Sequence, residues 1–317
     1  MTRALRIALA VLAGLALVTF PTWTASWESS RYATTIFRDM LVLATFALSL
    51  DLLVGTAGMP SLGHAAFFGA GAYAAGIAGQ RLSDNLVVGL AAAIAVSAVL
   101  SLVIGFFAVR AFGIFFLMLT LAFAQMVFAI AFQATDLTGG SNGFAGVRRP
   151  VLFGLDFNAP EDLFHLVATV FLVVLLVLWR VRASTYGRAL VGLRENERRM
   201  RALGYNTTRL RLSAFVLAGA IAAVAGTLSA YSIRFVSTND VGVGRSIEAF
   251  VAVLIGGAGT LLGPVVGAVV VLYIERVLPS SIAFAETVLG LVFIVFVIAA
   301  RQGIVGLARS VYARARA

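Results

Sequence analysis

Long apolar runs alternate with short polar stretches along nearly the whole 317-residue chain. Several runs exceed the roughly 18 apolar residues that are typical of a membrane-spanning helix. The pattern predicts an all-α polytopic membrane protein, a single domain over residues 1–317, with about 8–10 transmembrane segments, some of them short or broken. The predicted segments are 4–20, 36–54, 62–80, 86–108, 112–133, 163–179, 212–233, the short pair 246–258 and 261–275, and 283–300.

Composition agrees with a membrane setting, because 61% of the residues are hydrophobic and 12% are charged. The chain has no Cys, only two His, and Arg alone among its 24 basic residues. Disulfides, thiolate metal sites and histidine metal clusters are therefore excluded. Without Lys the chain also lacks a P-loop lysine and a Schiff-base amine. We expect no metal and no cofactor in this chain; if ATP drives the protein, that ATP must bind to another chain.

The arginines predict the orientation of the chain in the membrane. With the N-terminus inside, 16 arginines lie in cytoplasmic segments and 8 on the other side, nine of the 16 between residues 180 and 211. Positive charge favours the cytoplasmic side, so the N-terminus, the 180–211 loop and the C-terminus are predicted to be cytoplasmic. The net charge of +10 then reflects topology, and nucleic acid is not an expected partner.

Two glycine-rich segments resemble each other. "LLVGTAGMPSLG" (52–63) and "VLIGGAGTLLG" (253–263) both run from aliphatic residues through a glycine pair to Leu-Gly. Paired interruptions of this kind predict an internal repeat whose broken helices line a path near the midplane. The alternative is that small residues let helices pack closely. The candidate path residues are Gly55, Gly58, Ser61 and His64 in the first segment and Gly256, Gly257, Gly259 and Thr260 in the second.

Two ionisable residues lie in or beside the first segment. A single membrane histidine such as His64 serves more often as a neutral hydrogen-bonding group between helices than as a proton relay. Asp51 would be costly facing lipid, so we expect it to face the bundle interior or the cytoplasmic end. A structural role is the preferred interpretation for Asp51, with substrate contact as the alternative.

The stretch 180–211 is the longest predicted cytoplasmic segment. Inside it Leu190, Leu193, Met200 and Leu203 recur at spacings of three and seven, which predicts one apolar face of a short helix. Gly204 could then end the helix by adopting a left-handed backbone conformation. The segment is either a helix that docks on a partner or a polybasic loop that touches anionic lipid.

The sequence "GGSNG" (139–143) matches the G-x-S-x-G nucleophile elbow, with Ser141 as the nucleophile of a membrane serine hydrolase. That motif requires a strand-to-helix turn and a nearby His and acid. The segment instead lies in a polar loop with no strand pattern nearby, so a glycine and asparagine turn is the preferred interpretation.

Four motifs together carry a resemblance to a known family. They are "SLDLLVGTAGMPSLGHAAFFGAGAYAAG" (49–76), "LTGGSNG" (137–143), "YGRALVGLRENERRMRALGYNTTRLRLSAFVLAGAIAAVAGTLSA" (186–230) and "GGAGTLLGPVVGA" (256–268). In this order the chain resembles the LivM-type permease subunit of ATP-binding-cassette importers for branched-chain amino acids. Many relatives carry Asn at the place of Asp51 and a polar residue such as Gln at the place of Met59.

The resemblance implies a bacterial inner-membrane permease domain that is not itself an enzyme. Its expected partners are a sister LivH-type permease, two cytoplasmic ATPase subunits that bind the ATP and Mg, an extracytoplasmic solute-binding protein and membrane lipid. An autonomous secondary transporter or channel for a small neutral solute is the alternative, and the solute could also be another amino acid, an amide or urea. The residues expected to couple to the ATPase are Leu190, Leu193, Arg194, Glu195, Arg198, Met200, Leu203 and Gly204.

Overall fold

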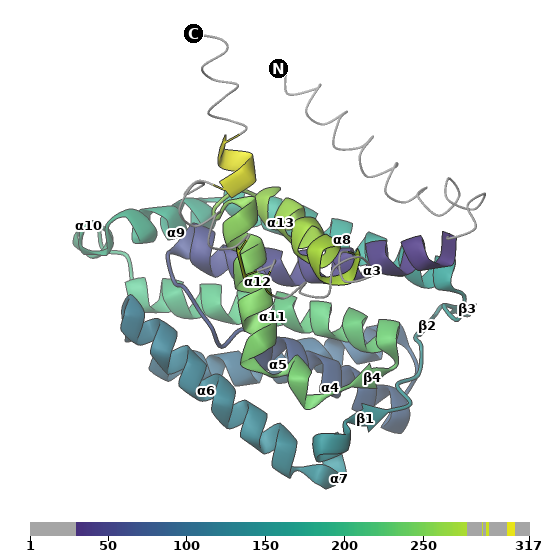
Figure 1. The fold of residues 1–317 in the computed structure, drawn as a ribbon. Helices are drawn as coiled ribbons and strands as arrows, with labels where there is room; N and C mark the ends of the chain where they lie inside the picture. The colour runs from purple at the N-terminus through teal and green to yellow at the C-terminus, as the bar shows by residue number, and fades with distance from the viewer. Residues whose placement is uncertain (1–29, 278–286, 288–289, 292–302, 308–317) are drawn as a thin grey trace.

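The computed structural model describes residues 30–277, 287, 290–291 and 303–307 (Figure 1). The predicted segment 4–20 and most of 283–300 lie outside the described residues. The main helices, in chain order, are α3 (Ser30–Asp51), α4 (Ala65–Arg81), α5 (Leu86–Ala108), α6 (Ile114–Gln133), α8 (Pro160–Ala183), α9 (Thr185–Glu195), α10 (Glu197–Ala202), α11 (Thr207–Ile233), α12 (Val243–Gly256) and α13 (Gly263–Leu272).

The structure confirms the helical membrane class. Within the described residues, five helical segments are long and apolar enough to cross a membrane: Tyr32–Ala57, α5, α6, α8 and α11. The predicted span 86–108 matches α5 residue for residue. Helix α4 has 17 residues and α12 and α13 have 14 and 10, so the short and broken segments predicted from the glycines are present.

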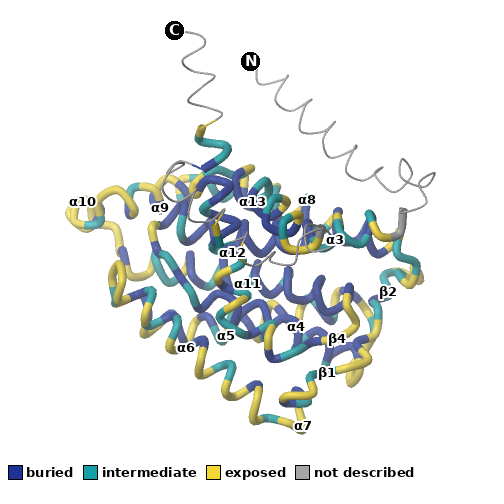
Figure 2. The backbone as a smooth tube through the Cα atoms, in the orientation of Figure 1, coloured by how far each residue is buried: buried dark blue, intermediate teal, exposed yellow. Residues whose placement is uncertain are grey.

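Helices α3 and α11 form the centre of the bundle, and α5 and α6 lie toward its outside. The tube in Figure 2 is buried along most of α3, α4 and α11 and mostly exposed along α6. Small residues allow this close packing, because a Cβ at Gly71 or Gly226 of these helices would overlap the backbone of the neighbouring helix. Ser97 of α5 adds a hydrogen bond of 2.8 Å to the carbonyl oxygen of Gly219.

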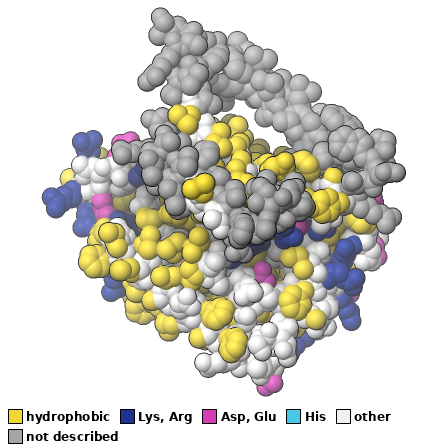
Figure 3. All heavy atoms as spheres, in the orientation of Figure 1, with side chains coloured by type: hydrophobic (Ala, Val, Ile, Leu, Met, Phe, Trp, Pro, Cys, Tyr) yellow, Lys and Arg dark blue, Asp and Glu magenta, His cyan; other side chains and the backbone are white. Residues whose placement is uncertain are grey.

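The polar connections gather at the two ends of the bundle. One end carries α9 and α10. The other carries two short antiparallel pairs, β1 (Phe144–Ala145) with β4 (Phe235–Val236) and β2 (Val151–Leu152) with β3 (Leu155–Asp156). Basic side chains gather near both ends in Figure 3, with hydrophobic side chains between them. This distribution fits a bundle whose middle lies in lipid and whose ends meet water.

The segment that carries Ser141 has no elbow geometry. It forms a three-residue 3-10 turn, η2 (Gly140–Asn142), between α7 (Thr135–Thr138) and β1. Glycines on both sides of Ser141 have positive φ, as the turn interpretation requires. A nucleophile elbow joins a strand to a helix, so the hydrolase interpretation of this motif is wrong.

Candidate functional site

The first glycine segment interrupts the helical structure between α3 and α4. Helix α3 continues into a π-helical turn, η1 (Leu52–Ala57), and Gly58 then takes a φ of 72°. The amide of Met59 still reaches back to the carbonyl oxygen of Leu53 at 2.9 Å. Residues 58–64 then run without helix until α4 begins at Ala65. Gly58 is needed here because a left-handed conformation strains any residue with a Cβ.

The second glycine segment is the turn between α12 and α13. Gly257 and Gly259 have φ values of 112° and 82°. The hydroxyl of Thr260 donates to the carbonyl oxygen of Gly257 at 2.8 Å and accepts from the amide of Gly263 at 3.0 Å. Thr260 therefore closes the turn and satisfies one of the first amides of α13, in the manner of a helix cap.

The two breaks touch each other. The amide of Gly259 donates to Oδ1 of Asp51 at 2.7 Å, and a Cβ added to Gly55 would overlap the backbone of Gly259. Asp51 is fully buried, and its Oδ2 pairs with the guanidinium of Arg182 at the end of α8. The expected interior position and structural role of Asp51 agree with this geometry. We call Asp51, Gly55, Gly58, the 257–260 turn, Arg182 and Arg194 the glycine junction.

Helix α9 lies directly over the glycine junction. Arg194, in its last turn, donates to the carbonyl oxygen of Gly55. The stem of Arg194 covers Gly58, since a Cβ placed there would lie 2.8 Å from Cγ of the arginine. Arg182, which holds Asp51, precedes α9 by three residues. Both breaks are therefore tied by arginines to the α8–α9 connection, and the junction lies at the α9 end of the bundle rather than at its midplane.

The remaining predicted path residues of the first segment lie inside the bundle. His64 and Ser61 are fully buried. The imidazole of His64 hydrogen-bonds the hydroxyl of Ser49 at 2.8 Å and stacks on Phe46 with 5.5 Å between ring centroids. Ser246 of α12 accepts from the amide of Ala65 at 2.8 Å. These contacts agree with the hydrogen-bonding interpretation of His64, while the path-lining role of the eight candidates stays a prediction.

Between the end of α8 and the start of α11, the stretch 180–211 contains two short helices, where one was predicted. Asn196 ends α9 with a φ of −159°, and its side chain caps α10 by accepting from the amide of Arg199 at 2.9 Å. Asparagine favours this capping role over a helix interior. Gly204 has a φ of 86° just beyond α10, which confirms the predicted stop.

The expected apolar face of this stretch is divided between the inside and the outside. Leu190, Leu193 and Met200 are buried within the chain, whereas the side chain of Leu203 is 66% exposed. Met200 packs on α9 where Gly192 leaves room, since a Cβ at that glycine would lie 2.8 Å from Sδ. The four residues therefore do not form one face of a single helix, because Leu190 and Leu193 pack into the core of the bundle and Met200 lies on a separate helix. Their coupling to an ATPase stays a prediction.

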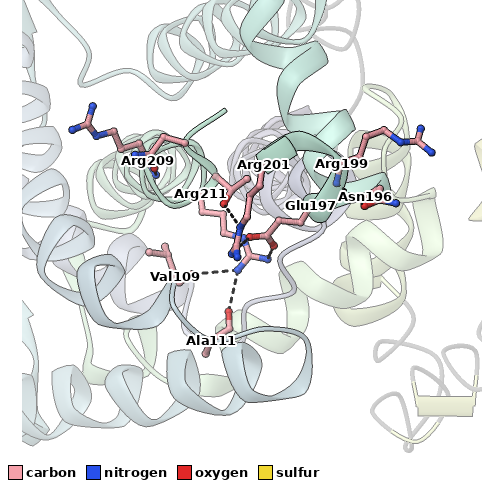
Figure 4. A network of polar contacts seen from close by, with 10 residues as sticks. Val109, Ala111, Asn196, Glu197, Arg199, Arg201, Arg209 and Arg211 are labelled. Carbon is pink, nitrogen blue, oxygen red and sulfur yellow. Dashed lines mark hydrogen bonds and ion pairs between the residues drawn. The ribbon is translucent and has the colours of Figure 1, made fainter. Parts of the chain in front are cut away.

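A second polar network ties α10 to the bundle (Figure 4). Glu197 pairs with Arg201 and with Arg211 of α11, each at 2.6 Å. Arg211 also donates to the carbonyl oxygens of Val109 and Ala111, both at 3.2 Å, in the turn between α5 and α6. The α9–α10 hairpin is thus fixed to the glycine junction on one side and to the α5–α6 turn on the other.

Part of the hairpin is exposed. It consists of Arg188, Val191, Glu195, Arg198 and Leu203, all of them exposed. Val191 and Leu203 are the apolar members, and these residues are 42% and 66% exposed. Behind this face, burial raises the pKa of the Tyr186 phenol, and a 2.8 Å hydrogen bond joins its hydroxyl to that of Ser213 on α11. The phenol therefore stays neutral at ordinary pH and fastens α9 to α11.

Arg182, Glu197 and Arg211 were absent from the candidates drawn from the sequence. Arg182 lies just after the apolar run of α8, where a positive-inside arginine is expected. The neighbouring sequence does not indicate that Asp51 is its ion-pair partner. The available signal was energetic, because a buried Asp51 requires a cation or several donors. Only the fold identifies which arginine supplies the charge.

Comparison with known proteins gives the family. The model of the "branched-chain amino acid transport system / permease component" family matches residues 32–300. The chain is 28% identical over 303 aligned residues to the high-affinity branched-chain amino acid transport system permease protein LivM of Salmonella typhimurium, covering 88% of this chain and 71% of that protein. LivM of Escherichia coli K12 is 27% identical over the same length.

A shorter match extends the range of relatives. The autoinducer 2 import system permease protein LsrC of Yersinia pestis is 34% identical over 113 residues, which cover 34% of this chain. No solved structure matches the chain. Because the family model matches most of its length, the chain belongs to the family of branched-chain amino acid transport system permease components and is a multi-pass membrane protein.

Proposed function

We propose that this chain is the permease subunit of an ATP-binding-cassette importer that moves branched-chain or related amino acids into a bacterial cell. In this proposal it works in the inner membrane with a sister LivH-type permease, two cytoplasmic ATPase subunits that hold ATP and Mg, and an extracytoplasmic solute-binding protein. Membership of the permease family supports the transport role. The absence of Lys, and with it of a P-loop lysine, supports placing the ATP in other chains.

The single observation that carries the coupling mechanism is the attachment of the α8–α9 connection to both broken helices. Arg194 holds the carbonyl of Gly55, and Arg182 holds Asp51, which in turn holds the amide of Gly259. A displacement of α9 together with the end of α8 by an ATPase would therefore pull on the end of α3 and on the α12–α13 turn together. The exposed outer face of the hairpin, with Val191 and Leu203 among charged residues, supports ATPase docking there.

The glycine junction is proposed to form part of the gate of the translocation path. Gly58 and Gly259 are exposed and Thr260 is half-buried, whereas Gly55 and Gly256 are buried in close backbone contacts. Broken helices expose peptide groups that a neutral zwitterion can contact without a charged ring. The buried glycines support the close-packing role that was the alternative for this motif.

The experiment that tests the proposal is reconstitution of the chain with its sister permease, ATPases and binding protein in liposomes. We expect uptake that depends on ATP, measured across a panel of amino acids, amides and urea. Uptake that persists without any ATPase would favour an autonomous transporter. Uptake of no amino acid in the panel would contradict the proposed substrate class.

Docking is tested in the same complex with matched surface variants. Val191→Ser with Leu203→Ser should weaken co-purification of the ATPase and lower transport, because both apolar side chains lie on the proposed outer face. Leu82→Ser is the control, since Leu82 is 74% exposed just beyond α4, on the connection that ends at α5. Unchanged co-purification of the double variant would assign this face to lipid or solvent.

A further inference from the structure

Helix α6 presents one face to the outside of the bundle. The helix lies along an edge of the molecule in Figure 1, and its tube in Figure 2 is mostly exposed. Its buried residues line the inner face and are Phe116, Thr120, Ala124 and Ala131. Six exposed residues recur on the other side at alternating spacings of three and four, and we call them the α6 seam: Phe115, Met118, Ala122, Gln125, Ala129 and Phe132.

Gln125 places a polar amide on the α6 seam at the middle of the membrane span. Helix α6 has 20 residues, so its length of about 30 Å matches the thickness of the hydrocarbon core. On that scale Gln125 lies within about 2 Å of the midpoint of the helix. The residue is exposed, and its side chain has no hydrogen bond to the described residues. An amide in hydrocarbon without a hydrogen-bond partner is strongly disfavoured, so lipid is an unfavourable neighbour for Gln125.

Two other outer helices keep their polar side chains satisfied. On α5, Ser97 and Ser101 are buried, and every exposed residue of that helix is apolar. On α8, Thr169 is exposed within the span, but its hydroxyl donates to the carbonyl oxygen of His165 at 2.7 Å in the same helix. The outer faces of α5 and α8 therefore suit lipid, whereas the α6 seam carries an amide that lipid would leave unpaired.

We propose that the α6 seam packs against a transmembrane helix of the sister permease, and that Gln125 hydrogen-bonds an amide or hydroxyl side chain of that helix. Polar side chains form such bonds between membrane helices, and small residues let the two backbones approach. Ala122 and Ala129 supply small residues on both sides of Gln125. Alternating spacings of three and four are typical of a helix that packs lengthwise against a second helix. The inference rests on the proposed importer function and deepens it by naming the surface that this partner covers.

The inner face of the same helix contacts the first glycine segment. A Cβ added to Gly63 would overlap the carbonyl oxygen of Thr120. Gly63 lies in the non-helical stretch 58–64, which connects the glycine junction to α4. Helix α6 therefore lies between the proposed partner and this stretch. A shift of the sister permease against the α6 seam would be transmitted to the first glycine segment through Thr120.

The first test locates the partner by photocrosslinking in membranes that contain all subunits of the complex. A photoreactive benzoylphenylalanine replaces Met118 on the α6 seam or, as the matched control, Val99 on α5; these residues are 61% and 64% exposed. We expect Met118 to give an adduct with the sister permease and Val99 to give none. An adduct of Met118 with a second copy of this chain, or no protein adduct at Met118, would overturn the inference.

The second test measures the role of the amide. Gln125→Leu removes the hydrogen-bonding groups at similar size and should weaken association with the sister permease about three- to tenfold, measured by dilution of the complex in detergent. Gln125→Asn keeps an amide and should restore much of the association. Gln133→Leu is the matched control, because Gln133 ends the same helix, where water can satisfy an amide. Association of Gln125→Leu equal to that of wild type would show that the amide has no partner there.

A third pair of variants tests the close approach of the two chains. Ala122→Trp should abolish co-purification of the sister permease, because the bulky ring keeps the backbones apart, whereas Ala95→Trp on the exposed side of α5 should not. In this Cys-free chain, Gln125→Cys should resist a water-soluble maleimide in the assembled complex. Rapid labelling would assign the α6 seam to a water-filled path and overturn the inference. If the sister permease does not co-purify with the wild-type chain, the proposed function itself fails.

Discussion

Replacing Asp51 with alanine removes the carboxylate that joins the ends of α3 and α8 to the turn between α12 and α13. Breaking a buried charged pair from one side costs about 3–5 kcal/mol. The side chain of Arg182 retains 18% exposure, so its guanidinium can turn toward water when its partner is lost. We therefore expect Asp51→Ala to lower the free energy of unfolding by about 3 kcal/mol, the low end of that range.

Asp51→Asn separates the two contacts of the same residue. The amide oxygen can still accept from Gly259 while the attraction to Arg182 is lost, so the cost should be about 1–2 kcal/mol. Transport should fall more in Asp51→Ala than in Asp51→Asn, because only the asparagine keeps the hydrogen bond to Gly259 that links the α12–α13 turn to α3. The alanine variant should import less substrate for each ATP hydrolysed than the asparagine variant.

The assay combines the midpoint of thermal unfolding of the complex in detergent with uptake and ATP hydrolysis in liposomes. Asp84→Ala is the matched control, because Asp84 and Arg148 are 36% and 61% exposed and such pairs contribute about 0–1 kcal/mol. An alanine variant at Asp51 that is as stable and as coupled as wild type would refute the reasoning. Equal losses in both Asp51 variants would show that the bond to Gly259 contributes nothing.

Three further outcomes are expected. Gly256→Ala should prevent assembly, because its Cβ would overlap the backbone at the start of α13, whereas Gly244→Ala, which has nothing within 4 Å of the added carbon, should assemble normally. Glu197→Gln should speed proteolysis of α10 in detergent, since it loses both ion pairs that fix the hairpin; an unchanged cleavage rate would contradict that role. An impermeant maleimide applied to intact cells should label Ser141→Cys and not Arg199→Cys, and the reverse pattern would invert the proposed topology.

The sequence predicted the local features of this fold well. The span of α5, the break after Ala57, the paired short helices α12 and α13 and the stop at Gly204 all follow from apolar runs and from glycines. These signals are local, because a lipid-exposed backbone must satisfy its own hydrogen bonds and glycine alone adopts left-handed conformations without strain. The glycine segments could therefore be located, although their contact had to be inferred from their similarity.

Tertiary structure decided which groups face each other. Leu193 and Met200 have the spacing of one helical face, yet Leu193 is buried in the core of the bundle and Met200 is buried against α9, because Asn196 splits the helix and α10 folds back. Arg194 was expected to couple to the ATPase, and the structure adds a contact within the chain, to the carbonyl oxygen of Gly55. Helical periodicity states which residues share a face but not what covers that face, and a charge at a helix end has many partners within reach. The pairing of Asp51 with Arg182, 131 positions apart, is therefore fixed only when the helices pack.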